Sequence, residues 1–241
     1  MIHVFATQEL LADAVARHVA ACAKAAISAN GRFTIALSGG STPRAAYTRL
    51  ATLDSRLTTD DWRLTHVLWS DERSVRPGDP RSNYRMAKEA LLDRVPIPAD
   101  QIHRIRGEDQ PEKGAADYER ELRALGSLDL VLLGLGEDGH TASLFPGQPA
   151  VRETGRWVVA VLDPDGELWR VTLTPPILNA ARNVAFVVSG ASKAAPLRQV
   201  LEGPFTPDLL PAQAIRPREG RLTWMVDEAA AAQLRSHRVM T

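Results

Sequence analysis

The chain has 241 residues, of which 44% are hydrophobic and 24% are charged. This composition excludes a disordered chain, and the length suits one large domain, which we expect to span residues 1–241. Lysine plus arginine number 29, as do aspartate plus glutamate, so the formal net charge is zero. That balance argues against nucleic acid or an anionic membrane as the main partner, because both favour proteins with a basic excess. A small anionic ligand stays possible, since a local cluster of cations needs no surplus over the whole chain.

The sequence carries no signal for export or membrane insertion. It begins Met-Ile-His-Val-Phe, unlike a secretory signal peptide, and no apolar run approaches the roughly 20 residues that cross a bilayer. We therefore expect a cytoplasmic protein. A monomer is the default expectation, because no heptad pattern or large apolar stripe stands out.

Cys22 is the single cysteine, which excludes an internal disulfide framework and a cysteine-based zinc cluster. It shares a helix face with Leu11, Val15 and Ala26. This spacing predicts an inert core thiol rather than a nucleophile.

Short apolar segments alternate with amphipathic ones along the chain. The pattern predicts helices over 8–28, 43–51, 83–94, 112–125 and 192–201, and strands over 33–38, 64–70, 128–134, 157–162, 169–174, 183–189 and 222–226. A turn at 163–166 joins one strand pair, and the stretch around His103 is expected to form a further short strand. Apolar strands separated by helices indicate an α/β fold whose mostly parallel sheet is covered on both faces. Ligands bind such sheets outside the carboxyl ends of the strands, where four loops carry unusual chemistry.

The first loop joins a strand to a helix and reads Ser38, Gly39, Gly40, Ser41, Thr42. Two glycines let the backbone turn N–H groups toward a ligand, two kinds of hydroxyl add donors, and the next helix presents a positive dipole end. The loop therefore suits a phosphate group, although it lacks the Walker pattern. The alternative is a glycine-rich turn with a serine or threonine cap.

The second loop, Trp69 to Arg73, places three ionisable residues at a strand end. A solvated turn is one interpretation. A position beside the first loop makes Asp71 and Arg73 candidates for the site.

The third loop runs from Gly134 to Pro146 and follows the most apolar strand. Three glycines within six residues predict a tight backbone at the sheet edge. Asp138 and His140 flank Gly139. Among six histidines, His140 is the one in a glycine-framed loop at this edge, where an imidazole can transfer protons at neutral pH.

The fourth loop, Ser189 to Lys193, ends a strand and begins a helix. A cation at a helix start opposes the helix dipole. An anionic ligand would relieve that conflict, whereas a solvated lysine is the alternative.

Together these segments resemble the 6-phosphogluconolactonase family. SGGSTP, WSDERSV, GLGEDGHTASLFPG and SGASKA occur in the family's order, and the resemblance covers essentially the whole chain. It implies a modified Rossmann-like three-layer α/β sandwich with a small appended β region, a fold shared with glucosamine-6-phosphate deaminase. It also implies hydrolysis of 6-phospho-D-glucono-1,5-lactone, with no organic cofactor and no metal.

The resemblance suggests a role for each candidate residue. His140 would be the general base that activates water, oriented by Asp138 or Asp71, a choice that the sequence leaves open. Arg73 would stabilise the developing oxyanion or hold the phosphate. The phosphate would rest on residues 38–42, with Lys193 and Arg44 as counter-charges. Asn83, Arg85, Arg104 and Arg182 are further candidates that the sequence does not rank.

Three alternatives remain. Deaminases of this fold carry a glutamate before the proline of the third loop, where this chain has Leu144 and Phe145, so an isomerase or deaminase is the weaker reading. A non-catalytic sugar-phosphate sensor lacks support because no helix-turn-helix precedes the α/β pattern. Ser41 and Ser143 as covalent nucleophiles are disfavoured, because the G-x-S-x-G elbow is missing.

Overall fold

The computed structural model describes residues 1–52, 57–235 and 239–240. The strands are β1 (Ile2–Phe5), β2 (Phe33–Leu37), β3 (Thr65–Trp69), β4 (Asp71–Arg73), β5 (Leu130–Leu133), β6 (Val158–Leu162), β7 (Trp169–Leu173), β8 (Asn183–Val188), β9 (Arg221–Asp227) and β10 (Val239–Met240). The α-helices are α1 (Gln8–Asn30), α2 (Ser41–Thr52), α3 (Thr59–Arg63), α4 (Asn83–Ala90), α5 (Pro111–Leu125), α6 (Pro175–Ala180), α7 (Ala194–Glu202) and α8 (Glu228–Ala231). Short 3-10 helices lie at Leu92–Arg94, Ala99–Gln101, Pro149–Arg152, Ala191–Lys193 and Pro211–Ala214.

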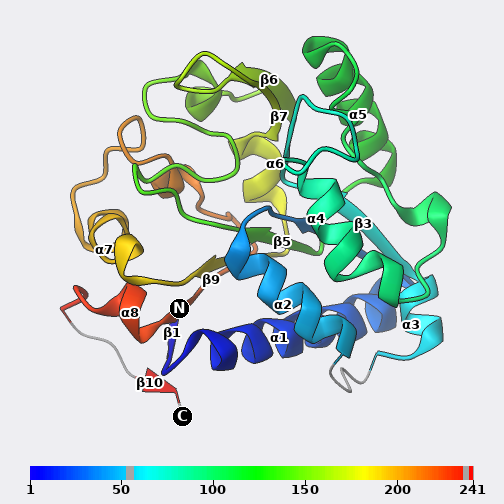
Figure 1. Ribbon diagram of the computed structural model, residues 1–241, viewed down its shortest axis with the longest axis horizontal. Helices are drawn as coiled ribbons and strands as arrows, with labels where there is room; N and C mark the ends of the chain where they lie inside the picture. Colours follow the sequence, from blue (N-terminus) through cyan, green and yellow to red (C-terminus); the bar gives the residue numbers. More distant parts are fainter. Residues whose placement is uncertain (53–56, 236–238, 241) are drawn as a thin grey trace.

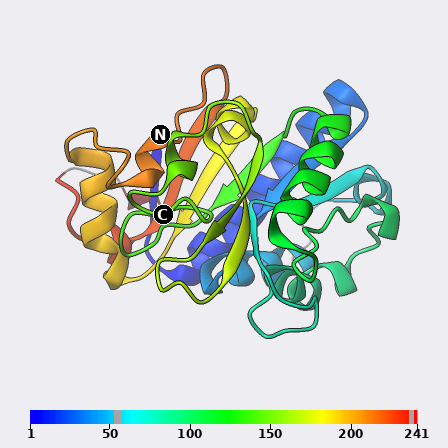
Figure 2. The same ribbon diagram turned by 90° about the horizontal axis from the view of Figure 1, so that it is seen from above.

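The main sheet has seven strands in the order β10-β1-β9-β8-β5-β2-β3, and each neighbouring pair is parallel. Figure 1 shows α1 and α2 below this sheet, with α6 and the β6–β7 hairpin above it. In both views α7 and α5 lie at opposite ends of the molecule (Figures 1 and 2). The predicted three-layer α/β fold is confirmed.

The central strands are buried along their whole length, as in sheets covered on both faces. Every residue of β2 and of β5 is buried. The large side chains of Phe33, Trp69 and Phe186 are almost completely inaccessible to solvent. This core fixes the strands, so the loops at their carboxyl ends start from rigid positions.

A second sheet of three antiparallel strands, in the order β4-β7-β6, forms the appended β region. Helix α5 packs against β6 and β7. Strand β4 corrects the interpretation of Asp71–Arg73 as a solvated turn, because these residues pair with Arg170–Thr172 and continue almost directly from β3.

The other departures from prediction are local. The helix expected over 83–94 ends at Ala90, because Leu91 leaves helical geometry with φ −132° and ψ −61°. His103 does not lie in a strand, since the stretch makes a single bridge between Val67 and Ile102. No described helix is both long and apolar enough to span a bilayer.

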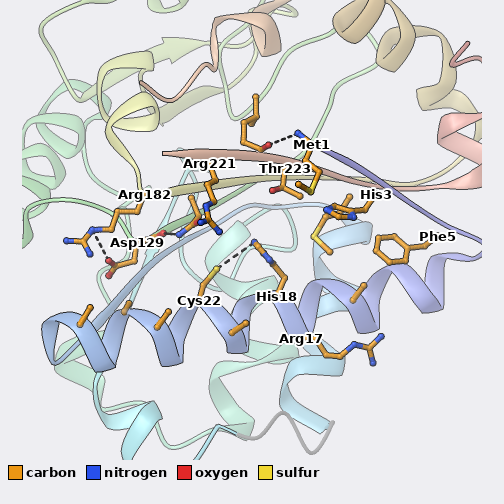
Figure 3. Close-up of a pocket in the computed structure, with 18 of the residues that line it drawn as sticks. Met1, His3, Phe5, Arg17, His18, Cys22, Asp129, Arg182, Arg221 and Thr223 are labelled. Atoms are coloured by element: carbon orange, nitrogen blue, oxygen red, sulfur yellow. Dashed lines mark hydrogen bonds and ion pairs between the residues drawn. The ribbon is translucent and has the colours of Figure 1, made fainter. Parts of the chain in front are cut away.

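A groove of about 1270 Å³ lies between α1 and the strands β1 and β9. Arg221 and Asn183 line it at the first residues of β9 and β8, so it reaches the amino ends of these strands. Figure 3 shows Cys22 and His18 in this groove, where the sulfur lies 3.7 Å from His18 Nε2. Cys22 is therefore only half-buried against the core, rather than within it as its spacing predicted.

Burial raises the pKa of the Cys22 thiol to about 11 and lowers the pKa of His18. Both shifts oppose a thiolate–imidazolium pair. We expect native Cys22 to react with iodoacetamide at pH 7.5 roughly 100-fold more slowly than a free thiol, because the thiolate is the reactive form. Mass spectrometry of the alkylated protein gives the rate, and the urea-unfolded chain is the control. A native rate equal to that of the unfolded chain would contradict this account of the thiol.

Candidate active site

The four candidate loops leave the carboxyl ends of β2, β3, β5 and β8. These strands are consecutive neighbours in the main sheet, in the order β8-β5-β2-β3, and all run in the same direction. Their loops therefore emerge side by side along one edge. This is the edge where open α/β sheets bind ligands.

His140 and Asp138 form a contacting pair in the loop after β5. Asp138 Oδ1 lies 2.5 Å from His140 Nδ1 and also accepts the His140 backbone N–H at 3.1 Å. A carboxylate is an acceptor, so this contact places the proton of a neutral ring on Nδ1 and leaves the lone pair on Nε2. The His140 side chain keeps 32% of its surface exposed, so the ring remains accessible.

The electrostatics of the pair favour a charged Asp138. Partial burial raises the pKa of this carboxyl, but the backbone N–H and the ring of His140 outweigh burial, so the pKa lies below its ordinary value. Asp138 is thus ionised at neutral pH and able to stabilise a protonated imidazole.

Two glycines make this loop geometry possible. A Cβ on Gly136 would lie 2.1 Å from His140 Nδ1, so a larger residue there would displace the ring. Gly139 has φ 80°, a value that favours glycine, and a Cβ there would lie 2.7 Å from Leu210. The Ala212 N–H donates to Gly139 O at 3.0 Å, which braces the loop from the segment before β9.

Asp71 has a different role from that of Asp138. Its side chain is buried, with Oδ2 accepting from Ser143 Oγ at 2.7 Å and Oδ1 accepting from Asn83 Nδ2 at 3.1 Å. A Cβ on Gly39 would lie 1.9 Å from Asn83 Oδ1, so the first loop packs directly on this amide. Asp71 therefore connects three loops, and Asp138 is the carboxylate that contacts His140.

Glu72, which is not among the residues predicted for the site, is also buried. Its carboxylate accepts the backbone N–H groups of Arg73, Asn83 and Tyr84 and the hydroxyl of Ser82. Burial raises its pKa despite these four hydrogen bonds. Glu72 thus fixes the start of α4 beside the second loop, a role that no local sequence signal reveals.

The first loop is held from α2. Tyr47 Oη accepts the Ser38 N–H and donates to Ser38 O, both at 2.9 Å. Gly40 has φ 105°, and Ser41 is the first residue of α2. The Ser38 hydroxyl is buried and has no hydrogen-bond partner among the described residues. This loop thus keeps an unused donor beside a helix start.

The predicted cations differ in their surroundings. Lys193 Nζ lies 3.9 Å from Glu137 Oε1, which brings the fourth loop to the third. Arg73 is half-buried and donates from Nη1 to Arg81 O. Arg44 is exposed on α2, and its charge helps to lower the pKa of Glu89 on α4.

The four further candidates from the sequence lie in different surroundings. Asn83 belongs to the Asp71 network, whereas Arg85 pairs with Glu89 and Arg104 pairs with Glu108. Arg182 lies before β8, at the opposite edge of the sheet, and its Nε is 3.5 Å from Asp129. Within the described ranges no three His, Cys, Asp or Glu side chains are grouped to hold a metal ion. That the reaction needs no metal remains a prediction.

Comparison with known proteins identifies the family. Residues 6–224 match the family model described as glucosamine-6-phosphate isomerases/6-phosphogluconolactonase. The chain belongs to this family. Its members include the 6-phosphogluconolactonase of a Nostoc species, which is 46% identical over 219 residues, or 87% of this chain and 88% of the relative.

Two other members also match nearly the whole of this chain. A probable chloroplastic 6-phosphogluconolactonase 3 of Oryza sativa subsp. indica is 39% identical over 97% of this chain and 76% of its own. The solved structure of 6-phosphogluconolactonase from Trypanosoma brucei superposes with a TM-score of 0.87 at 32% identity, covering 97% of this chain and 98% of that one. The family that the four loops indicated is thus confirmed, and the similarity extends over nearly the full chain.

The Asp71–Ser143 contact can be tested by stability. We expect Ser143→Ala to lower the free energy of unfolding by about 1.5–3 kcal/mol, because a buried carboxylate oxygen loses its hydroxyl donor. Urea unfolding followed by circular dichroism measures the change. The exposed Ser28 on α1 supplies the control, since Ser28→Ala should have little effect. Equal stability of the two variants would contradict the connecting role of Asp71.

Proposed function

We propose that this protein hydrolyses 6-phospho-D-glucono-1,5-lactone to 6-phospho-D-gluconate, a step of the oxidative pentose phosphate pathway. The observation that carries the proposal is the Asp138–His140 pair, because its hydrogen bond leaves the lone pair on Nε2 of a partly exposed ring at the ligand-binding edge. The relatives that bear the name 6-phosphogluconolactonase support the same reaction class.

In the proposed mechanism His140 Nε2 takes a proton from a water molecule that attacks the lactone carbonyl carbon, C1. The imidazolium then returns the proton to the ring oxygen as the tetrahedral intermediate collapses and the ring opens. Asp138 accepts the Nδ1–H throughout and stabilises the charged ring. A lactone is an activated ester, so one base, correct orientation and a cation near the developing oxyanion are sufficient help.

The substrate phosphate would bind the first loop. The backbone of residues 38–42, the unpartnered Ser38 hydroxyl and the start of the 12-residue helix α2 all offer donors to an anion. Lys193, held near the third loop, would add a positive charge. Arg44 is the weaker candidate, because it is exposed and its charge acts toward Glu89.

Other chemistry on this fold has less support. Leu144 and Phe145, where deaminases of this fold have a glutamate, are buried apolar side chains that offer no acid for ring opening or isomerisation. Ser143 is fully buried and donates its hydroxyl proton to Asp71, so it is not available as a nucleophile. A sensor role remains the non-catalytic alternative, which the activity assay below decides.

We also infer that the chain acts as one domain and as a monomer, because His140 and all four loops come from residues 38–193 of one polypeptide. A cytoplasmic location stays a prediction. The compartment varies within the family, since the Oryza sativa relative is named as chloroplastic.

The decisive variant for the mechanism is His140→Ala. We expect kcat to fall by about 10² to 10⁴, the usual contribution of a general base. The assay follows 6-phosphogluconate formation from freshly generated lactone, after subtraction of the spontaneous rate. Wild-type protein that fails to exceed the spontaneous rate would overturn the proposed function.

Asp138→Asn tests whether the carboxylate of Asp138 is needed to prepare His140 as the base. The amide N–H would favour the His140 tautomer that carries its proton on Nε2, so we expect kcat to fall by about 10² or more with little change in KM. Asp60→Asn, a change of an exposed carboxylate on α3 that pairs with Arg63, is the matched control. A normal kcat in Asp138→Asn would remove Asp138 from the mechanism.

Lys193→Ala tests the phosphate site. Phosphate binding is shared by the ground and transition states, so we expect a higher KM and a nearly unchanged kcat. A loss confined to kcat would instead assign Lys193 to the reacting carbonyl.

A further inference from the structure

Two arginines face each other on the appended sheet. In the antiparallel β4–β7 pair Arg73 lies opposite Arg170, and two residues earlier Asp71 lies opposite Thr172. Directly opposite residues project to the same face of a sheet, where like charges destabilise the pair. Asp71, Thr172, Arg73 and Arg170 therefore form one continuous row.

This row is turned toward the loop that carries His140. Ser143 donates its hydroxyl to Asp71 and its backbone N–H to Thr172 Oγ1, at 2.7 and 3.1 Å. Further along, the guanidinium carbon of Arg170 lies 5.8 Å from the centre of the Phe145 ring. The Phe145 and His140 rings are in turn 4.9 Å apart between their centres. A short chain of contacts thus joins Arg170 to His140.

Both guanidinium groups hold an unused donor. The Nε atoms of Arg73 and Arg170 are buried, and neither has a hydrogen-bond partner within the described ranges. Arg170 Nη2 lies 3.6 Å from Asp163 Oδ2, whereas no described carboxylate lies within ion-pair distance of Arg73, whose Nη1 donates to a neutral carbonyl. Among the described residues, only Arg170 of the two cations has a carboxylate within ion-pair distance, and the Nε of each cation lacks an acceptor.

We propose that Arg170, together with Arg73, is a substrate-binding residue whose guanidinium group binds an oxyanion of the sugar phosphate. A planar guanidinium presents paired N–H groups that match the geometry of phosphate and carboxylate oxygens. Such an anion would satisfy the two Nε donors and offset the repulsion between the opposed cations. This inference rests on the proposed function, because the ligand is taken to be the lactone or its product.

The product offers two oxyanions of this kind, the phosphate on C6 and the carboxylate formed at C1. Calorimetric titration with inorganic phosphate, with gluconate and with 6-phosphogluconate distinguishes them without an activity measurement. We expect Arg170→Ala to weaken 6-phosphogluconate binding by about 10- to 100-fold, the range for a charge-assisted hydrogen bond. A parallel loss for inorganic phosphate assigns the pair to the phosphate, and a parallel loss for gluconate assigns it to the C1 end.

Three further variants separate binding from structure. Arg170→Lys keeps the positive charge but loses the paired N–H groups of the guanidinium, so its affinity for 6-phosphogluconate should be intermediate. Asp163→Asn removes the ion pair but leaves Arg170 free to bind, so affinity should be kept or increased. Arg120→Ala removes an exposed cation on α5 that pairs with Asp117, and should change nothing. Thermal melts confirm that each variant is folded.

Unchanged affinity for all three ligands in folded Arg170→Ala would overturn the inference. An equal loss in Asp163→Asn would also overturn it, because the ion pair and not the anion would then explain the effect. These failures differ from failure of the proposed function, which is wild-type protein that does not accelerate lactone hydrolysis.

Discussion

The buried carboxylate of Asp71 is the constraint on which the geometry of the site depends. It lies where the chain passes from the main sheet into the appended sheet, and it accepts hydrogen bonds from Ser143 of the third loop and Asn83 of α4. A buried anion is costly unless its oxygens are hydrogen-bonded, so these donors cannot be lost independently. Because Gly39 packs against the Asn83 amide, the same contact also fixes the first loop.

The two carboxylates have different roles. Asp71 is shielded from solvent and sets where the loops lie, whereas Asp138 is partly exposed and contacts the imidazole itself. The appended sheet takes part in the same scheme. One face of it braces the His140 loop through Thr172 and Ser143, and the same face carries the opposed pair Arg73 and Arg170. A small sheet that first looks like an addition to the fold thus supports the His140 loop directly.

Much of the fold and part of the site could be predicted from the sequence, because their signals are local. The glycine-framed loop around His140 follows an apolar strand, and both features lie within about 20 residues of sequence. The identity of the partner carboxylate was not predictable in this way. In the sequence Asp71 and Asp138 are equal candidates, because the contact that occupies Asp71 comes from Ser143, 72 residues away.

The remaining errors have the same cause. Three charged residues in β4 resemble a solvated turn, since only pairing with β7 about 100 residues later makes them a strand. Arg170 gave no signal, because a charged residue at the start of a predicted strand looks like an ordinary solvent-facing position. Its significance depends on the residue opposite to it, and the register between two distant strands cannot be predicted from the sequence of either strand alone.

The central claim is that one sugar phosphate spans the loops at the carboxyl edge of the main sheet, with C1 at His140. A crystal structure with bound 6-phosphogluconate tests it most directly. We expect a C1 carboxylate oxygen within hydrogen-bond distance of His140 Nε2, with the phosphate in contact with arginine, lysine or first-loop donors at the same edge. Product bound instead in the groove between α1 and β9, or at the carboxyl edge with C1 turned away from His140, would contradict it.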